Sequence, residues 1–314
     1  AASAIQITPE IAKTAEQVYV FQRTPNWIFP RPDHEHPPWL KQLFGRMPWI
    51  MRGLRWILYG LLDFVNFPQF KKRGKWLRTL REKKAIKLMR QEVPDPMLQE
   101  KLIPDYPMGC KRVLLSSNYY PALILPNADL ITSPIQSISQ EQIITEDGPI
   151  GPIDTIVYAT GYNVMNPLGR MVIQGINGQD LQETWGDSFF AYKGVTVPGF
   201  PNFCILLGPN TALGHSSVIF MIEQQVQYTL RYLKSLAPDA YLDVKQEACN
   251  SYNADIEASF KDRVWSGSCA SWYIDAAGRI PTLWPHSTTQ YWRIMRKRDP
   301  EAYTILKATE SSST

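Results

Sequence analysis

The stretch AIQITPEIAKTA at residues 4–15, followed by QVYVFQ at residues 17–22, decides the fold class. The first run has the composition of a helix, with Pro9 as its weak point, and the second alternates β-branched and aromatic residues as a strand does. A helix that leads directly into such a strand is typical of the second half of a βαβ unit. Strands and helices also mix along the rest of the chain, so we predict an α/β fold.

Composition indicates a globular protein with a sizeable core. The chain has 314 residues, enough for two domains, of which 44% are apolar and 12% aromatic. These values exclude disordered, collagenous and coiled-coil chains. The four cysteines form no CxxC pair, which excludes a disulfide scaffold and argues against a zinc ribbon. Reduced thiols are therefore expected at Cys110, Cys204, Cys249 and Cys269.

Residue 1 is Ala and no signal peptide follows it, so we expect a processed, engineered or partial chain.

Positive charge is concentrated in one segment. Residues 71–90 hold ten Lys or Arg and one acid, a net +9, so the total of +4 leaves −5 for the rest of the chain. The basic pI therefore does not by itself indicate nucleic-acid binding. Residues 39–92 contain few helix breakers and are predicted helical. The part at 47–90 has two interpretations: an amphipathic segment on an anionic membrane, or a helical insertion packed on the domain of the opening βαβ unit, with its basic face in water. We favour the insertion.

The remaining elements follow from periodicity and turn residues. We predict strands at 112–115, 128–131, 137–144 and 153–159, with a hairpin turn at Asp147-Gly148. Helices are predicted at 216–236, with Ser216 or Ser217 as N-cap, and at 247–260. The proline-rich residues 26–38 are expected to form an extended connection.

Arg23 directly follows the predicted strand at 17–22. In a dinucleotide-binding βαβ unit a glycine turn precedes the helix, and the residue at the end of the second strand selects the cofactor. An acid there binds the 2′-hydroxyl of NAD, whereas Arg suits the 2′-phosphate of NADP. Ala1-Ala2-Ser3 would then be the end of a glycine turn whose glycines lie upstream. Taken alone, however, Arg23 is better explained as an ordinary surface residue.

Five segments, in order along the chain, point to one family. They are ASAIQI…VYVFQRTPNWIFPRPD at 2–33, DYPMGCKRVLLSSNYYPAL at 105–123, IVYATGY at 156–162, GVTVPGFPNFCILLGPNTALGHSSVIFMIE at 194–223 and SWYIDAAGRIPTLWP at 271–285. Together they resemble the class B flavin-containing monooxygenases of the Baeyer–Villiger type, near the 4-hydroxyacetophenone monooxygenase group. The resemblance covers essentially the whole chain. It implies an enzyme that uses NADPH, FAD and O₂ to convert small-molecule ketones into esters or lactones through a C4a-peroxyflavin.

The resemblance also implies roles for particular residues. Arg112 would stabilise the negatively charged peroxyflavin, because a guanidinium stays charged and gives up no proton. Lys111 would join Arg23 at the 2′-phosphate of NADP. The other residues implied in cofactor binding are Ser3, Thr24, Thr160, Gly161, Asn210, Thr211 and Trp272.

Several of these residues have a simpler interpretation beside the functional one. Gly161 would permit close approach of the backbone to a cofactor, or it ends a strand in an ordinary turn. Asn210 and Thr211 would border the flavin before a helix whose N-terminus carries a partial positive charge, or they belong to an ordinary loop. Trp272 would form a wall of the substrate pocket, or it lies in the core.

The resemblance divides the chain as a partial two-dinucleotide-binding-domain flavoprotein. It assigns 1–24 and 105–150 to a Rossmann-like NADP-binding domain truncated at its N-terminus, 25–104 to a helical insertion, and 151–314 to the C-terminal part of the FAD-binding domain. The family motifs GxGxxG and FxGxxxHxxxW do not occur in the sequence. We therefore expect that an FAD-binding half is required as a partner, and that this chain exposes apolar surface without it.

Other classes of site find little support. His34 and His36 are two residues apart in a proline-rich loop, which is poor metal geometry, and there is no Ser–His–Asp signature or P-loop. We expect no metal and no nucleic-acid partner. The alternatives to ketone oxidation are oxygenation of nitrogen or sulfur by a related flavin monooxygenase, and a non-catalytic, membrane-associated remnant. We expect a cytoplasmic protein, with membrane contact through 47–90 as the open alternative.

Overall fold

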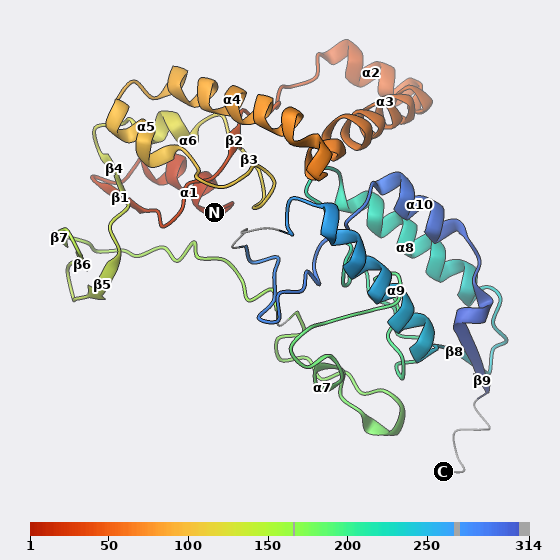
Figure 1. Ribbon diagram of the computed structural model, residues 1–314. Coiled ribbons are helices and arrows are strands. Elements are labelled where there is room, and N and C mark those ends of the chain that lie inside the picture. The colour runs from red at the N-terminus through yellow and green to blue at the C-terminus, as the bar shows by residue number, and fades with distance from the viewer. Residues whose placement is uncertain (166, 267–270, 308–314) are drawn as a thin grey trace. The chain divides into compact units, whose positions relative to one another are not determined.

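The computed structural model describes residues 1–165, 167–266 and 271–307, which fold into two compact units (Figure 1). The first unit comprises Ala1–Glu35 and Trp76–Tyr162, and the second comprises His36–Lys75 and Asn163–Thr314. The range 25–104 therefore contributes to both units.

Short parallel strand pairs lie at the centre of the first unit. β1 (Val18–Phe21) pairs in parallel with β4 (Ala128–Ile131), and β2 (Ile28–Phe29) pairs in parallel with β3 (Leu114–Leu115). Parallel strands require a crossover between them, which helices supply here. The predicted α/β class is confirmed.

Four helices surround these strands: α1 (Ala4–Ile11), α4 (Lys75–Glu92), α5 (Pro96–Leu102) and α6 (Tyr119–Leu123). Ile5 of α1, Met89 of α4 and Leu102 of α5 share one buried apolar cluster with the strand residues Ile28 and Leu130. The prediction of a helix at 4–15 is too long at its end, because the chain leaves the helix after Ile11, two residues beyond Pro9, and turns at 12–14.

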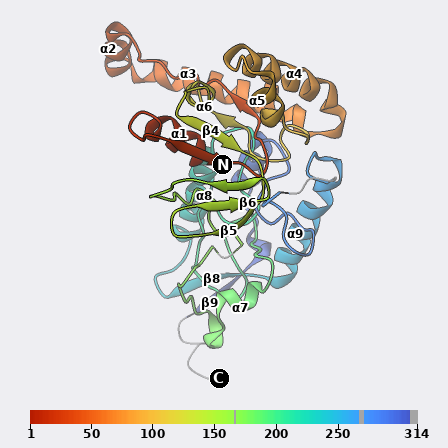
Figure 2. The same ribbon diagram turned by 90° about the vertical axis from the view of Figure 1, so that its left-hand side faces the viewer.

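The strand predicted at 137–144 and the hairpin predicted after it correspond to a small antiparallel sheet. It consists of β5 (Ile135–Ile138), β6 (Ile143–Thr145) and β7 (Gly148–Ile150), and Figure 2 shows the arrows of β5 and β6 side by side. A single strand at 137–144 is therefore wrong. The chain reverses within it, where Ser139 Oγ donates to the carbonyl oxygen of Gln142 at 3.0 Å. The hairpin predicted around Asp147-Gly148 is confirmed, since Thr145 pairs with Gly148.

Residues 153–159 do not form the strand that their apolar sequence predicts. They belong to no strand of the described structure, and Ile156, Val157 and Tyr158 are exposed. An apolar run becomes a strand only where a neighbouring strand supplies hydrogen-bonding partners. No strand of the described residues lies alongside this run.

The second unit is mostly helical. Its N-terminal part consists of α2 (Pro38–Arg46), α3 (Pro48–Gly60), the π-helical turn η1 (Leu61–Asn66) and the 3₁₀ turns η2 (Phe67–Phe70) and η3 (Lys72–Gly74). Its later helices are η4 (Ile176–Gly178), α7 (Leu181–Trp185), α8 (Val218–Leu233), α9 (Gln246–Ser259), η5 (Phe260–Asp262), α10 (Thr288–Arg296) and η6 (Pro300–Ala302). β8 (Ala240–Val244) and β9 (Tyr303–Lys307) pair antiparallel.

The two long helices predicted in this unit are confirmed, with small shifts at their ends. α8 packs alongside α10 (Figure 1). Ser217 is the N-cap residue of α8 as predicted, but its side chain makes no capping hydrogen bond. Within the described residues, no helix is both long enough and apolar enough to cross a membrane.

The cysteines differ from the expectation of four reduced thiols. Cys204 and Cys249 are free, whereas Cys110 is disulfide-bonded, so the expectation is wrong for Cys110. Cys269 lies outside the described residues. Disulfide formation depends on which loops the fold brings together, and sequence spacing does not reveal that.

Candidate functional site

The loop before β3 is tied to the segment after β1 by a reciprocal pair of hydrogen bonds. Trp27 Nε1 donates to the carbonyl oxygen of Tyr106 at 3.0 Å, and Tyr106 Oη donates to the carbonyl oxygen of Pro25 at 2.9 Å. Arg23 lies at the first end of this connection and Lys111 at the second. The hydrogen bonds thus join the two segments that carry these cations.

The surroundings of Lys111 act on its charge. The ammonium of Lys111 sits over the ring of Tyr106, 4.6 Å from its centroid. Burial lowers the pKa of Lys111, the positive charge of Arg23 lowers it further, and the carboxylate of Asp105 acts in the opposite direction. Two cations that repel each other in this way are stabilised by an anion held by both. A phosphate group fits this pair, since it carries up to two negative charges and several acceptor oxygens.

Three further predicted residues lie in the first unit near these segments in sequence. Thr24 adjoins Arg23 and is half-buried, and Arg112 adjoins Lys111 and is exposed. Ser3 is exposed at the N-cap position of α1, where its side chain makes no capping hydrogen bond and its carbonyl oxygen accepts from the amides of Gln6 and Ile7.

Thr160 and Gly161 follow the exposed run 153–159 and are themselves exposed. Gly161 has a φ of 102°, in the region that favours glycine, and a Cβ added there would meet nothing within 4 Å. The backbone conformation alone therefore accounts for a glycine here.

Asn210 and Thr211 lie in the second unit and are buried within a tied loop. Asn210 Nδ2 donates to the carbonyl oxygens of Ile280 at 2.6 Å and Leu283 at 3.0 Å. Thr211 Oγ1 donates to the carbonyl oxygen of Gly208 at 2.6 Å. The amide hydrogens of Asn210 are thus both used inside the protein, which makes this residue a support of the loop. The pair precedes α8, which begins at Val218, with six residues between Thr211 and the helix.

The close approach of Gly194 to Thr211 and Pro209 also fixes this loop. Gly194 has a φ of 70°, and a Cβ added there would lie 2.2 Å from Thr211 Cγ2 and 2.7 Å from the carbonyl oxygen of Pro209. Such distances exclude any larger residue without movement of the loop.

Trp272 lies at the surface of the second unit. Its side chain is 47% exposed, and its ring centroid lies 4.2 Å from that of the neighbouring Tyr273. The core interpretation of Trp272 is therefore wrong. An exposed indole of this kind offers a flat apolar wall and one N–H donor.

Sequence reasoning missed a buried acid at the start of α10. The side chain of Asp63 accepts hydrogen bonds from the backbone amides of Thr288 at 2.7 Å and Thr289 at 3.1 Å, from both their hydroxyls, and from His215 Nε2 at 3.3 Å. One signal in the sequence could have identified it: Asp63 is the sole acidic residue between Glu35 and Glu82.

A second missed cluster surrounds Asp299, which is 4% exposed. Its carboxylate lies 2.7 Å from Lys193 Nζ and accepts hydrogen bonds from Tyr192 Oη at 2.5 Å and Tyr232 Oη at 2.6 Å. Tyr228 Oη donates to it at 3.1 Å. No motif marks these residues, because they come from separate segments of the chain.

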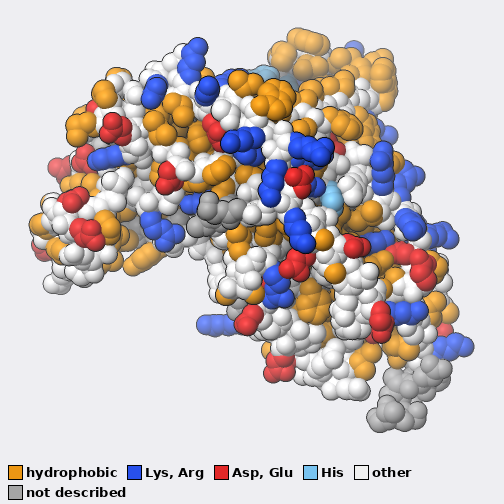
Figure 3. All heavy atoms as spheres, viewed as in Figure 1, with side chains coloured by type: hydrophobic (Ala, Val, Ile, Leu, Met, Phe, Trp, Pro, Cys, Tyr) orange, Lys and Arg blue, Asp and Glu red, His pale blue; other side chains and the backbone are white. Residues whose placement is uncertain are grey.

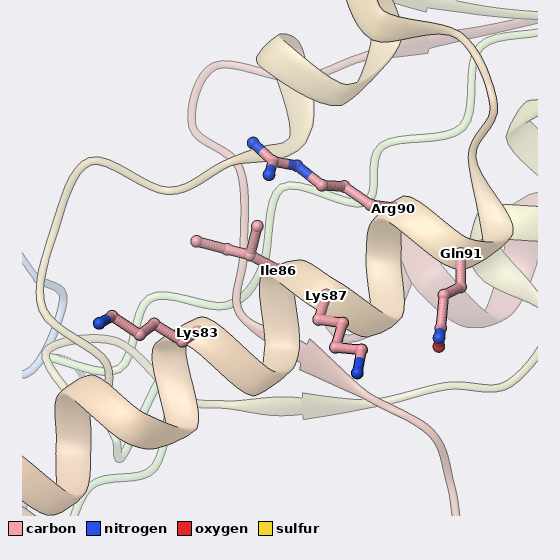
Figure 4. A pocket seen from close by; sticks show the side chains of 5 residues that line it. All are labelled: Lys83, Ile86, Lys87, Arg90 and Gln91. Atoms are coloured by element: carbon pink, nitrogen blue, oxygen red, sulfur yellow. The ribbon is translucent and has the colours of Figure 1, made fainter.

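A hollow of about 470 Å³ lies along α4, lined by Lys83, Ile86, Lys87, Arg90 and Gln91 (Figure 4). None of the predicted site residues lines it. Within the described part of the chain, no three or more His, Cys, Asp or Glu side chains form a group that could hold a metal ion.

Comparisons with known proteins identify relatives along almost the whole chain. It is 38% identical over 311 residues to a Baeyer-Villiger monooxygenase of Pseudomonas aeruginosa, a match that covers 96% of this chain and 58% of the relative. It is equally 38% identical to a Baeyer-Villiger monooxygenase of Streptomyces coelicolor, covering 98% of this chain and 59% of that protein. The chain thus spans less than two thirds of the length of these relatives. No family model matches the sequence.

Comparison with solved structures identifies the same kind of protein as comparison of sequences. The crystal structure of OTEMO in complex with FAD and NADP superposes with a TM-score of 0.79 at 25% identity, covering 98% of this chain and 65% of OTEMO. The predicted fold, part of a two-dinucleotide-binding flavoprotein, is confirmed. In sequence and in fold, the chain is related over nearly its whole length to the Baeyer–Villiger-type class B flavin monooxygenases and corresponds to a part of them.

Proposed function

We propose that this chain is part of a cytoplasmic monooxygenase that uses NADPH, FAD and O₂ to convert small-molecule ketones into esters or lactones. The proposal is supported by the likeness to the two Baeyer-Villiger monooxygenases and to OTEMO, which was solved with FAD and NADP. A portion that binds the rest of FAD is required to complete the site.

The observation that carries the proposal is the pair of hydrogen bonds between Trp27, Tyr106 and Pro25, which joins the segments of Arg23 and Lys111. In keeping with it, the charge of Arg23 contributes to lowering the pKa of Lys111. These side chains would hold the 2′-phosphate of NADPH, the group that distinguishes it from NADH. Arg offers several N–H donors in a planar fork, and Lys adds a point charge, so both together match a doubly charged phosphate. Thr24 and Ser3 would contribute hydroxyl groups to the same nucleotide.

Bound FAD would supply the redox chemistry and the activation of O₂. Arg112, which adjoins Lys111, would place a permanent positive charge where negative charge develops during oxygen transfer. Asn210 and Thr211 would hold their loop in shape at the border of the flavin. Thr160 and Gly161 would lie along the cofactor with little side-chain bulk, and Trp272 would wall the substrate pocket.

Cofactor preference tests the proposal. In the flavin-loaded enzyme, Arg23→Ala and Lys111→Ala should each lower kcat/KM for NADPH by roughly 10–100-fold, the effect of one charged hydrogen bond, and leave kcat/KM for NADH nearly unchanged. Arg31→Ala is the matched control, because Arg31 is exposed and pairs with Asp33 on the surface. Equal losses for both nucleotides would place the two cations outside the nucleotide site.

Product analysis tests the reaction class. Arg112→Ala should leave reduction of the flavin by NADPH largely intact and abolish ester formation from a ketone. A normal yield of ester from this variant would contradict the role of Arg112. Oxygenation of a thioether in place of the ketone by the unmodified enzyme would assign it to the nitrogen- and sulfur-oxygenating relatives.

A further inference from the structure

The helix pair α2–α3 exposes an unusual amount of apolar surface. Neither helix contains a single buried residue. Trp49 is 66% exposed, Ile57 63%, and Phe64 of the following turn 69%. We call the exposed side of residues 39–65 the α2–α3 surface; its most prominent members are Trp39, Trp49, Trp56, Ile57 and Phe64. In Figure 3, hydrophobic side chains gather over these helices. Contiguous apolar surface of this kind marks an interaction site.

Contacts with α8 and α10 hold the C-terminal end of α3 in place. Arg55 forms an ion pair with Glu223 of α8 at 2.5 Å, and the ring of Tyr59 lies 4.5 Å from that of Phe220. Tyr59 Oη also lies 3.0 Å from Thr289 Oγ1, and Asp63 is buried at the start of α10. These contacts fix the C-terminal end of α3 to α8 and α10. The exposure of the other residues of α3 is therefore a property of the folded unit.

The charged residues of the segment 36–62 all have one sign. Residues 36–62 contain no Asp or Glu, and they carry Lys41, Arg46, Arg52 and Arg55. The next acid, Asp63, is buried and does not reach the surface. Arg55 is paired with Glu223 of α8, so Arg46 and Arg52 carry the positive charge in this argument. Apolar side chains beside these guanidinium groups are complementary to a layer that is apolar inside and negatively charged outside.

We propose that the α2–α3 surface docks on an anionic lipid bilayer, with α3 lying in the plane of the interface. α3 has 13 residues, a length of about 20 Å at 1.5 Å per residue, which suits a helix lying along the membrane. Trp39, Trp49 and Trp56 are the residue type that settles at the boundary of headgroups and acyl chains. Arg46 and Arg52 would meet the anionic headgroups.

A second protein molecule is a weaker match for this surface. A self-complementary dimer would bring the cations of one copy toward those of the other, without acids to offset them. A bilayer containing anionic lipid offers negative charge along the whole length of the helix pair, and it requires no specific partner surface.

Vesicle binding by the flavin-loaded enzyme that contains this chain tests the inference, using phosphatidylcholine vesicles with and without one quarter phosphatidylglycerol. We expect binding to the anionic vesicles and quenching of tryptophan fluorescence by brominated lipid. The variant Trp49→Ser/Ile57→Ser/Phe64→Ser should bind at least tenfold more weakly. Met171→Ser/Val172→Ser is the matched control, because these side chains are also exposed in the second unit, and it should bind normally. Circular dichroism establishes that each variant is folded.

The contribution of the charged residues to vesicle binding can be measured separately from that of the apolar residues. Arg46→Gln/Arg52→Gln should weaken binding to anionic vesicles by about fivefold for each charge removed. Lys83→Gln/Lys87→Gln on α4 removes equal charge elsewhere and should have a smaller effect. The variant Trp39→Phe/Trp49→Phe/Trp56→Phe should keep binding and lose most of the quenching. Absence of vesicle binding, binding unaffected by the serine triple variant, or a stable dimer lost in that variant would each overturn the proposal.

Discussion

The carboxylate of Asp63 lies 3.3 Å from Nε2 of His215, a residue 152 positions further along the chain. Asp63 also accepts hydrogen bonds from the amides and hydroxyls of Thr288 and Thr289, the first two residues of α10. The N–H groups at a helix start have no partner within the helix and carry partial positive charge. One acid thus links the base of α3, the loop before α8 and the start of α10.

Removal of this acid should destabilise the second unit. Asp63→Ala leaves buried donors of Thr288 and Thr289 without partners, at about 1–3 kcal/mol for each unsatisfied group. We expect a loss of about 2–5 kcal/mol in the free energy of unfolding, measured by denaturant titration. Asp33→Ala, which removes an exposed acid paired with Arg31, should change it by less than about 1 kcal/mol. Equal effects of both substitutions would disprove the role of Asp63.

The stabilising effect of Asp63 should also depend on pH. Burial alone would raise the pKa of Asp63, but hydrogen bonds from His215, Thr289 and Thr288 hold it well below its usual range. Because the folded pKa lies below the unfolded value of about 3.9, this contribution is complete above that pH and is lost as the pH falls further. The difference in Tm between the unmodified chain and Asp63→Asn should therefore be constant from pH 7 to 5 and shrink below about pH 4. A difference that stays constant down to pH 3 would contradict it.

The sequence predicts elements well where the decisive contacts are local. The helices at 218–233 and 246–259 and the strand at 18–21 lie close to their predicted places, since periodicity and caps are properties of neighbouring residues. The run 153–159 is the opposite case. Its composition is that of a strand, but strand formation depends on a partner elsewhere, and the described chain supplies none.

In the candidate site, too, single residues could be predicted from the sequence but their contacts could not. Arg23 stands out by its position after a strand, and Lys111 by resemblance, so each could be named from sequence. The connection between their segments depends on hydrogen bonds of Trp27 and Tyr106. Both residues lie in the quoted family segments, but the sequence does not reveal that they bond to each other's segment. The clusters around Asp63 and Asp299 combine residues up to 226 positions apart, and sequence reasoning had no means of assembling them.

Affinity for NADP should report the charge state of Lys111. Its pKa is lowered by burial and then by Arg23, and raised by Asp105. The affinity should fall as the pH rises through this lowered pKa, because the deprotonated amine no longer attracts phosphate. Arg23→Ala should shift the midpoint of the fall to higher pH, although it weakens binding overall. Asp105→Asn should shift the midpoint to lower pH. Titration of NADP binding between pH 7 and 10.5 measures both shifts, and shifts of the same sign would refute the arrangement.

The buried pair of Lys193 and Asp299 should respond unequally to loss of either partner. Lys193→Met leaves Asp299 with the hydroxyl donors of Tyr192, Tyr228 and Tyr232. Asp299→Asn leaves a buried ammonium without a countercharge, beside the carbonyl oxygen of Ile294 at 3.1 Å and over the rings of Tyr192 and Tyr228. We expect the second substitution to cost about 3–5 kcal/mol and the first about half as much.

The double variant Lys193→Met/Asp299→Asn decides whether the two residues act as an ion pair. It removes both charges together, so it should be more stable than Asp299→Asn alone. Free energies of unfolding for the four proteins give the coupling energy. Additive losses would show that Lys193 and Asp299 stabilise the unit independently.

The close approach of Gly194 to Thr211 predicts a variant that disturbs the loop at 208–212. In Gly194→Ala the new methyl group would meet Thr211 Cγ2 at 2.2 Å and the carbonyl oxygen of Pro209 at 2.7 Å. The φ of 70° adds strain of about 1–2 kcal/mol for any residue other than glycine. The loop must therefore move, and we expect a total loss of at least about 2 kcal/mol in the free energy of unfolding.

A second substitution separates the two clashes at Gly194. Thr211→Ser removes the nearest clashing methyl group and keeps the hydroxyl that donates to Gly208. Added to Gly194→Ala, it should restore part of the lost stability, and the strain at position 194 should remain. If the loop borders the flavin, retention of FAD should fall in Gly194→Ala and recover in the double variant in step with Tm. No recovery of stability in the double variant would mean that the clash with Pro209, and not that with Thr211, governs the position of the loop.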